Sequence, residues 1–261
     1  MRRRLDQELV RRGLTRSRSE AREAIDAGRV TVAGRPALKA AGLVAPDEPV
    51  RLEGPARRYV SRGGEKLAAA LDRFGVDPRG RRCLDAGAST GGFTDVLLQR
   101  GAAHVVAIDV GYGQLAWSLR SDPRVTPIER TNIRDVGSTD LPYRADLLVA
   151  DLSFIRLGKV LPALAALAAN DAEAVLLVKP QFEAGPGAVG RGGVVADPSV
   201  WRRVLADVLE DARAAGFGPQ GLMASPLRGP AGNAEFLLHA RRGVVGNDVD
   251  VDAAIREVPE P

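Results

Sequence analysis

The stretch of the chain best suited to chemistry is residues 84–95, which read L-D-A-G-A-S-T-G-G-F-T-D between an apolar strand and a helix. Glycines on such a turn let a ligand lie directly against the backbone. A second acid, Asp109, ends the next apolar strand 24 residues after Asp85, an offset that suits hydrogen bonds to a ribose diol. The spacing is not the G-x-G-x-x-G of dinucleotide sites, so a compact nucleoside such as S-adenosylmethionine fits better. A glycine-rich turn that binds nothing is the alternative.

The predicted nucleoside site extends over three strand ends. We expect the glycine turn to hold the methionine end of the nucleoside and Asp109 to bind its ribose hydroxyls. Asn132 and Asp135 follow the third strand, where they either border the adenine or belong to an ordinary surface loop. The full set of expected contacts is Asp85, Gly87, Ser89, Gly91, Gly92, Phe93, Asp109, Asn132 and Asp135.

Lysine is scarce in this chain, and two lysines lie where chemistry is expected. Of 37 basic residues only four are lysine. Lysine can lose its proton when it is desolvated or placed near another cation, whereas arginine cannot. Lys179 ends the apolar strand A-V-L-L-V and so shares a sheet edge with Asp85 and Asp109. Lys66 lies in S-R-G-G-E-K-L, beside the helix that leads to the first strand.

Two further acids are expected to join these lysines. Asp151 ends the apolar strand L-L-V-A, and Glu235 lies in N-A-E-F-L, where a charge within an apolar strand needs a partner. Because strand ends converge at one cleft, Lys66, Asp151, Lys179 and Glu235 should meet there. Taken singly, Asp151 could be a turn residue, and Lys66 or Glu235 could be plain salt-bridge partners. The four together favour a catalytic site.

The elements that must position these residues alternate from about residue 80 onward. Apolar runs and turn residues predict strands at 81–86, 104–110, 125–130, 146–151, 173–179, 219–224 and 234–240. Helices are predicted at 63–74, 91–100, 112–120, 157–169 and 197–215. This alternation indicates an α/β fold, a mostly parallel sheet with helices on both faces. Seven strands, the last two close together, resemble the Rossmann-like sheet of class I methyltransferases, which has one reversed edge strand.

Composition limits the class of protein. The net charge is +4, but residues 1–62 hold 15 Lys/Arg against 8 Asp/Glu, so the first quarter is expected to bind a polyanion. The single cysteine excludes an internal disulfide, and the two histidines fall in strands, which disfavours a Ser-His-acid hydrolase. No signal peptide or membrane-length apolar run is evident, so we expect a cytoplasmic protein without a membrane partner. No metal site is predicted.

The basic first quarter is predicted to be a small domain, residues 1–59. A helix over 3–14, a second helix after the capping-box sequence S-R-S-E and a V-T-V-A-G-R hairpin resemble the RNA-binding module named after ribosomal small-subunit protein four. Arginines would position the RNA through its phosphates, and a merely solvated basic face is the alternative. The arginines concerned are Arg3, Arg4, Arg11, Arg12, Arg16, Arg18, Arg22 and Arg29.

The catalytic candidates carry a second resemblance. Lys66, Asp151, Lys179 and Glu235 match the Lys-Asp-Lys-Glu tetrad of FtsJ-like ribose 2′-O-methyltransferases. The strings S-R-G-G-E-K-L, D-A-G-A-S-T-G-G-F-T, D-V-G-Y-G-Q-L, D-L-S-F-I and V-K-P-Q-F-E are similar to those of the TlyA family, often labelled hemolysin A. The resemblance implies a catalytic domain over 60–242 that uses S-adenosylmethionine. Its substrate would be a cytidine ribose of ribosomal RNA, in the small and large subunits or only in the large one.

The tetrad suits that chemistry. A ribose 2′-hydroxyl must lose its proton as it attacks the sulfonium methyl, and we expect Lys179 to accept or steer that proton with Lys66 nearby. Asp151 and Glu235 would hold the two lysines, and much of the acceleration would come from positioning. A non-catalytic ribosome-binding factor and, on the family's label, a membrane-lytic protein are the alternatives. The acidic tail, residues 243–261, is predicted to be disordered.

Overall fold

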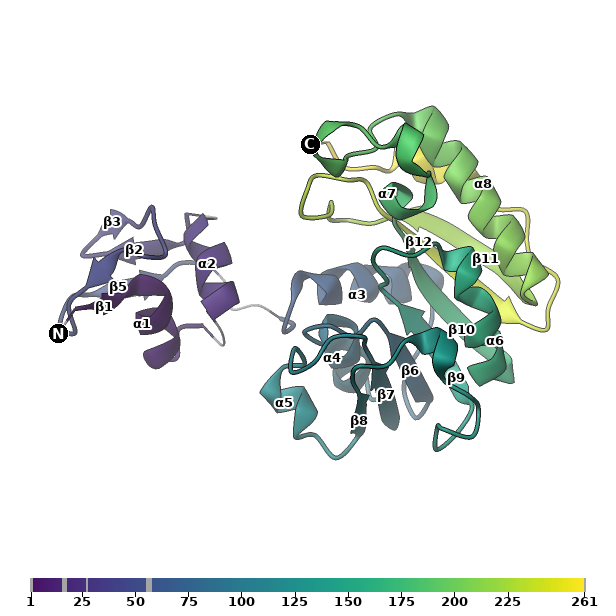
Figure 1. Ribbon diagram of the computed structural model, residues 1–261, viewed down its shortest axis with the longest axis horizontal. Helices are drawn as coiled ribbons and strands as arrows, with labels where there is room; N and C mark the ends of the chain where they lie inside the picture. Colours follow the sequence, from purple (N-terminus) through teal and green to yellow (C-terminus); the bar gives the residue numbers. More distant parts are fainter. Residues whose placement is uncertain (1, 16–17, 27, 55–57, 261) are drawn as a thin grey trace. The chain divides into compact units, whose positions relative to one another are not determined.

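The computed structural model (Figure 1) describes residues 2–15, 18–26, 28–54 and 58–260. Backbone contacts divide the chain into two compact units, Met1–Arg57 and Arg58–Pro261. Tyr59, which the sequence prediction places in the first domain, is buried in the second unit against the backbone of Gly64. The larger unit therefore begins two residues before the predicted start at residue 60.

The smaller unit packs two helices against short strands. The strands are β1 (Arg3–Arg4), β2 (Val30–Val32), β3 (Arg35–Pro36), β4 (Leu43–Val44) and β5 (Val50–Leu52), and the helices are α1 (Leu5–Arg11) and α2 (Arg18–Asp26). β1 pairs antiparallel with β4, so the first helix begins at residue 5 rather than at residue 3 as predicted. The other three strands form a sheet in the order β3-β2-β5. Leu9, Ala24 and Val30 lie in the core between the helices and the strands.

The larger unit contains the predicted seven-stranded sheet. Its strands are β6 (Arg82–Ala86), β7 (His104–Ile108), β8 (Val125–Ile128), β9 (Ala145–Ala150), β10 (Ala168–Val178), β11 (Phe217–Ala224) and β12 (Phe236–Arg242). Their order is β11-β12-β10-β9-β6-β7-β8, and β12 runs antiparallel to both of its neighbours. The reversed strand thus lies one position in from the edge, because the β11–β12 hairpin folds β12 back between β11 and β10.

Helices cover both faces of this sheet, as predicted. Their bounds are α3 (Arg62–Phe74), α4 (Gly92–Gln99), α5 (Trp117–Arg120), α6 (Leu161–Leu167), α7 (Pro180–Glu183), α8 (Pro198–Ala214) and α9 (Val251–Arg256), with 3-10 turns η1 (Ile133–Asp135), η2 (Leu157–Lys159), η3 (Pro186–Ala188) and η4 (Arg191–Gly193). Leu67 of α3 and Val96 of α4 join one apolar core, while Leu164 of α6 and Trp201 of α8 join the core on the opposite face (Figure 1). Within the described ranges, none of these helices combines the length and apolar character needed to cross a bilayer.

Local sequence explains where the helices beside the site begin and end. In α3 the buried Leu67, Ala70 and Leu71 recur at helical spacing and form one apolar stripe. α3 ends at Gly75, whose left-handed backbone (φ 67°) suits glycine at a helix C-terminus. α8 begins where the side chain of Asp197 accepts a backbone hydrogen bond at 2.8 Å.

The acidic C-terminal segment is ordered, so the prediction of disorder over 243–261 is wrong for the residues described. Ala254 of α9 is 1% exposed, and Asp252 forms an ion pair with Arg202 of α8 at 2.5 Å. The apolar side chains that pack on the same core as α8 are Val249, Val251, Ile255 and Val258. Because these residues give the segment an apolar face to bury, its charge does not prevent it from folding.

Candidate active site and RNA-binding surface

The predicted glycine turn joins β6 to α4 and touches the end of β9. Gly87 has a left-handed backbone (φ 85°), and a Cβ at this position would lie 2.5 Å from the carbonyl oxygen of Asp151. Only glycine fits this crossing, because a side chain would collide with the neighbouring backbone. The backbone N–H of Asp151 in turn donates to the carbonyl oxygen of Ala86 at 3.0 Å. The turn and Asp151 are therefore held in direct contact.

The later part of the turn is packed against protein. A Cβ at Gly91 would lie 2.3 Å from the side chain of Leu119, and one at Gly92 would lie 2.1 Å from the hydroxyl oxygen of Ser61. Phe93, the second residue of α4, is 3% exposed and its ring packs in the apolar core. The cofactor contacts predicted for these three residues are therefore restricted to their backbone groups. The two glycines have no side chain and no room for one, and the ring of Phe93 is buried.

Asp85 is a fully buried acid beside the turn. Its Oδ2 accepts hydrogen bonds from the backbone N–H (3.0 Å) and the hydroxyl (2.6 Å) of Thr94. Its Oδ1 has no hydrogen-bond partner among the residues that the structure describes. Burial raises the pKa of Asp85 to about 7 despite the bonds from Thr94. A buried carboxylate oxygen without a donor fits a site whose donor arrives with the ligand, such as the ammonium group of S-adenosylmethionine.

Asp109, just after β7, also meets the glycine turn. Its Oδ2 accepts the backbone N–H of Ser89 at 2.7 Å, and its Oδ1 accepts that of Gly111 at 2.6 Å. Ser89 has a left-handed backbone (φ 48°), which is uncommon outside glycine and is concentrated at functional sites. A carboxylate held by two amides still has lone pairs to accept the hydroxyl groups of a ribose.

Asn132 and Asp135 lie beyond β8. The backbone N–H of Thr131 donates to the carbonyl oxygen of Asp109 at 3.0 Å, so this loop borders the predicted ribose site. The side-chain oxygen of Asn132 caps η1 by accepting the backbone N–H of Arg134 at 3.1 Å. Asp135 is exposed within η1. The structure thus gives Asn132 a local capping role in addition to its position near the ribose site.

The four tetrad residues form two ion pairs. Lys66, in α3, is 7% exposed and pairs with Glu235, which is 3% exposed and directly precedes β12. Lys179 directly follows β10, and its Nζ lies 2.5 Å from Oδ1 of Asp151. Lys179 also donates to the hydroxyl oxygen of Ser153 at 3.0 Å, a partner that sequence reasoning missed. Each lysine is therefore held by one carboxylate.

Strand register brings these pairs to one edge of the sheet. Lys179 and Glu235 lie one residue beyond Val178 and Phe236, which are partners across β10 and β12. Asp151 lies one residue beyond the end of the adjacent strand β9. Because the glycine turn touches Asp151, the lysine-bearing edge and the predicted cofactor site are continuous.

Three exposed aromatic side chains follow the ends of β7 and β9, and sequence reasoning missed them. Tyr112 is 66% exposed, Trp117 is 78% exposed and Phe154 is 90% exposed. Phe154 has a left-handed backbone (φ 64°), and its ring centre lies 4.9 Å from that of Phe182. The guanidinium of Arg130 lies 4.1 Å from the ring centre of Tyr112. Aromatic residues are only 4% of the chain, so each of these exposed rings is a candidate for stacking on a ligand.

In the smaller unit a buried acid organises three of the predicted RNA-binding arginines. Asp6 is fully buried and contacts the guanidinium groups of Arg4 (3.0 Å), Arg18 (3.0 Å) and Arg22 (3.4 Å). The hydrogen bond from Arg4, followed by that from Arg18, holds the pKa of Asp6 well below its usual range. The three arginine side chains are 39% to 54% exposed. One carboxylate therefore orders three guanidinium groups that keep a net positive charge at the surface.

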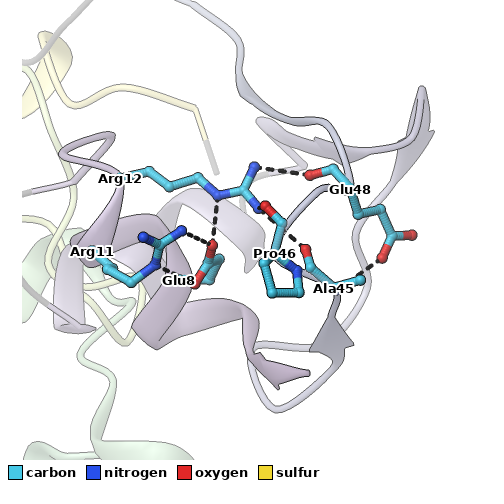
Figure 2. A network of polar contacts seen from close by, with 6 residues as sticks. All are labelled: Glu8, Arg11, Arg12, Ala45, Pro46 and Glu48. Atoms are coloured by element: carbon cyan, nitrogen blue, oxygen red, sulfur yellow. Dashed lines mark hydrogen bonds and ion pairs between the residues drawn. The ribbon is translucent and has the colours of Figure 1, made fainter. Parts of the chain in front are cut away.

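Figure 2 shows a second arginine network, centred on Glu8. Glu8 is 1% exposed and accepts hydrogen bonds from Arg11 at 2.6 Å and from Arg12 at 2.7 Å, which lower the pKa of Glu8 to about 2. The same guanidinium of Arg12 also donates to the backbone oxygens of Ala45, Pro46 and Glu48. These donors fasten the end of α1 to the 45–48 turn, so Arg12 has a structural role within this unit, and its contact with RNA stays a prediction.

The other arginines predicted to bind RNA differ in how far they are exposed. Arg11 is half exposed, and Arg3 is exposed in β1. Arg29 is partly buried beside Gly54. Arg16 lies outside the described residues.

Two protein-family models match this chain. The FtsJ-like methyltransferase model matches residues 59–242, and the S4 domain model matches residues 3–50. The first match covers most of the larger unit and includes the glycine turn and the whole tetrad.

Individual relatives match both units. The chain is 56% identical to the 16S/23S rRNA (cytidine-2′-O)-methyltransferase TlyA of Mycobacterium tuberculosis, over 91% of this chain and 89% of that protein. It is 34% identical to the 23S rRNA (cytidine-2′-O)-methyltransferase TlyA of Campylobacter jejuni, over 69% of this chain and 70% of that protein. A solved structure from Streptococcus thermophilus, described as a hemolysin, has a TM-score of 0.78 at 40% identity and covers 98% of this chain and 94% of its own.

Proposed function

This chain belongs to the TlyA family of FtsJ-like methyltransferases, and we propose that it transfers a methyl group from S-adenosylmethionine to the ribose 2′-hydroxyl of cytidine in ribosomal RNA. The main support within the molecule is the contact between the glycine turn and Asp151, which pairs with Lys179. That contact puts an amine next to the site that would hold the methyl donor. A ribosomal substrate also implies that the enzyme acts in the cytoplasm.

The larger unit has the donor and acceptor groups that a nucleoside cofactor requires. Bound S-adenosylmethionine would supply an electrophilic methyl group on a positively charged sulfur. The unpaired oxygen of Asp85 would accept its ammonium group, and Asp109 would accept its ribose hydroxyls. Gly87 leaves the backbone bare between them, so the ligand can approach the strand ends closely.

Lys179 would act on the attacking oxygen. Two of its three N–H groups can be assigned to Asp151 and Ser153, so one remains for the ribose oxygen. An ammonium group held at that oxygen would stabilise the negative charge that develops as the hydroxyl loses its proton to water and the carbon–oxygen bond forms. Bound S-adenosylmethionine would supply the methyl group, so the other products would be S-adenosylhomocysteine and one proton. The buried pair of Lys66 and Glu235 would hold α3 and β12 in register beside this site.

Two surfaces would bind the RNA. In the smaller unit the guanidinium groups ordered by Asp6 would bind phosphates, which positions the RNA without reading its sequence. In the larger unit Phe154 lies beside Phe182, whose ring centre is 5.9 Å from Nζ of Lys179. Phe154 would therefore stack on the target base next to the reacting ribose.

Methyl transfer to separated ribosomal subunits tests this function. With tritiated S-adenosylmethionine and subunits from cells that lack the gene, we expect label in both subunits, as the name of the 56% identical relative states for that protein. Nuclease digestion should release the label as 2′-O-methylcytidine. Label in the large subunit alone would restrict the substrate to that subunit. Binding of subunits without any transfer would instead indicate a non-catalytic ribosome-binding factor.

Substitutions identify the residues that carry out the reaction. Lys179→Ala should reduce transfer at least about a hundredfold, because the group that assists loss of the proton is gone. Phe154→Ala should reduce it about tenfold through lost stacking on the base. Lys159→Ala is the matched control, because this lysine is exposed in η2 and makes no hydrogen bond or ion pair with the tetrad among the described residues. Equal transfer by wild type and Lys179→Ala would reject the assigned role.

A further inference from the structure

We infer that the C-terminal segment (residues 244–260) supports catalysis by bracing the loop that leads into Glu235, with Arg228 as the positioning residue that links them. The loop comprises residues 225–233 and joins β11 to β12. The FtsJ-like family model ends at residue 242, so the segment lies outside the part of the chain that this model matches. The inference rests on the proposed function, in which Glu235 holds Lys66.

The 225–233 loop lies directly against Glu235. A Cβ at Gly229 would be 2.6 Å from Oε1 of Glu235, so the loop backbone packs on the carboxylate itself. The backbone N–H of Ser225 donates to the carbonyl oxygen of Glu235 at 2.8 Å. The N–H of Gly229 donates to the carbonyl oxygen of Asn233 at 2.9 Å and closes the loop on itself. A shift of this loop would therefore move the Glu235 carboxylate.

Arg228 connects this loop to two other parts of the unit. Its Nη1 donates to the carbonyl oxygen of Gly232 at 2.9 Å, within the loop. Its Nε and Nη2 both donate to the carbonyl oxygen of Pro259, at 2.9 Å and 2.6 Å. Its own carbonyl oxygen accepts a hydrogen bond from Arg62, the first residue of α3, at 3.0 Å. One residue thus joins the loop under Glu235, the helix that bears Lys66 and the C-terminal segment.

The carbonyl oxygen of Pro259 has a fixed position because the residues before it contact β11, the core and α3. The backbone N–H of Asn247 donates to the carbonyl oxygen of Pro219 in β11 at 2.7 Å. α9 buries Ala254, which is 1% exposed. Glu257 forms an ion pair with Arg73 of α3 at 3.0 Å. These contacts fix the path of the segment over the sheet and bring its last described residues to the loop.

Loss of the Arg228–Pro259 link would loosen the loop without removing any tetrad residue. The cofactor site at the glycine turn is built from β6, α4 and β7, so binding of S-adenosylmethionine should not change. Small displacements of positioning groups reduce rates strongly. We expect kcat to fall on the order of tenfold while KM for the cofactor stays the same.

The test compares two ways of removing the link. Arg228→Ala removes the donor, and a chain ended after residue 258 removes the acceptor at Pro259 while it keeps Glu257 and Val258. Each should lower kcat about tenfold, and the combined variant should be no slower than either, because both changes delete one interaction. Arg228→Lys should be intermediate, since one ammonium cannot reproduce the fork of hydrogen bonds to Gly232 and Pro259. Arg73→Gln, which removes only the exposed ion pair to Glu257, is the control and should match wild type.

Amide hydrogen exchange separates this inference from the proposed function. Residues 225–235 should exchange faster in both Arg228→Ala and the shortened chain, and this readout does not require activity. If wild type transfers no methyl group, the proposed function fails. Amide exchange over residues 225–235 then shows by itself whether Arg228 and the C-terminal segment hold the loop in place. Exchange and kcat like those of wild type in Arg228→Ala, or kcat losses that multiply in the combined variant, would overturn the inference.

Discussion

The buried pair of Lys66 and Glu235 allows stability and catalysis to be separated by experiment. Changing Lys66 to Met leaves the Glu235 carboxylate, 3% exposed, without its countercharge. An uncompensated buried charge typically destabilises a protein by about 3–5 kcal/mol. For a unit of this size each kcal/mol corresponds to about 2–4 °C, so the Tm should fall by about 6–20 °C.

Replacing both residues with Met removes the two charges together. Met has a straight apolar side chain, so it can fill much of the space of either residue. Apolar replacements of a buried ion pair are often neutral or stabilising, and the double variant should recover most of the lost Tm. It should nevertheless transfer almost no methyl group, because the register of α3 and β12 beside Lys179 would no longer be held by charge.

Thermal unfolding without cofactor, followed by circular dichroism, measures the first effect, and tritium transfer measures the second. Arg202→Gln is the control for loss of an ion pair, because its pair with Asp252 is exposed and worth at most about 1 kcal/mol. A Lys66→Met variant as stable as wild type would contradict the expected cost of leaving Glu235 without its countercharge. Full transfer by the double variant would refute the role of the pair in catalysis.

Two further predictions concern a buried acid and the arginines. Because the pKa of Asp85 is raised to about 7 from an ordinary value near 4, its contribution to stability is complete below pH 4 and is lost as the pH rises through 7. Asp85→Asn should therefore flatten the fall in Tm between pH 4 and 7 and weaken binding of S-adenosylmethionine in equilibrium dialysis; an unchanged pH slope would contradict this. Arg18→Ala should lower affinity for RNA and reduce the slope of log K against log salt by about 1, with little change in Tm. Arg12→Ala should instead lower the Tm and leave that slope nearly unchanged, and the reverse pattern would identify Arg12 as an RNA contact.

Local patterns in the sequence are sufficient to predict the large sheet and to bring the tetrad residues to one edge of it. Apolar runs bounded by turn residues are local patterns, and each marked a strand that the structure contains. Lys179 and Asp151 directly follow two such strands, so the topology of a parallel sheet suffices to bring them to one edge. The concentration of arginine in the first quarter is likewise visible in composition alone.

Which of these side chains remain available to a ligand depends on contacts between distant segments of the chain. Arg12 and Arg18 are alike in sequence, yet Arg12 donates to a turn more than 30 residues away while Arg18 stays half exposed beside Asp6. The unpaired oxygen of Asp85 also depends on how α4 packs over β6. Such partners come from distant segments, so a local pattern cannot reveal them.

The C-terminal segment is a further case in which a local sequence pattern and the tertiary contacts lead to different expectations. Its acidity is a property of the sequence and suggested disorder. Its folding depends on a few apolar side chains that are buried against α8 and the sheet. A helix as short as α9 is stable only when such packing supports it. That surface exists only after the larger unit has folded, and it is what brings Pro259 to Arg228 beneath the loop at Glu235.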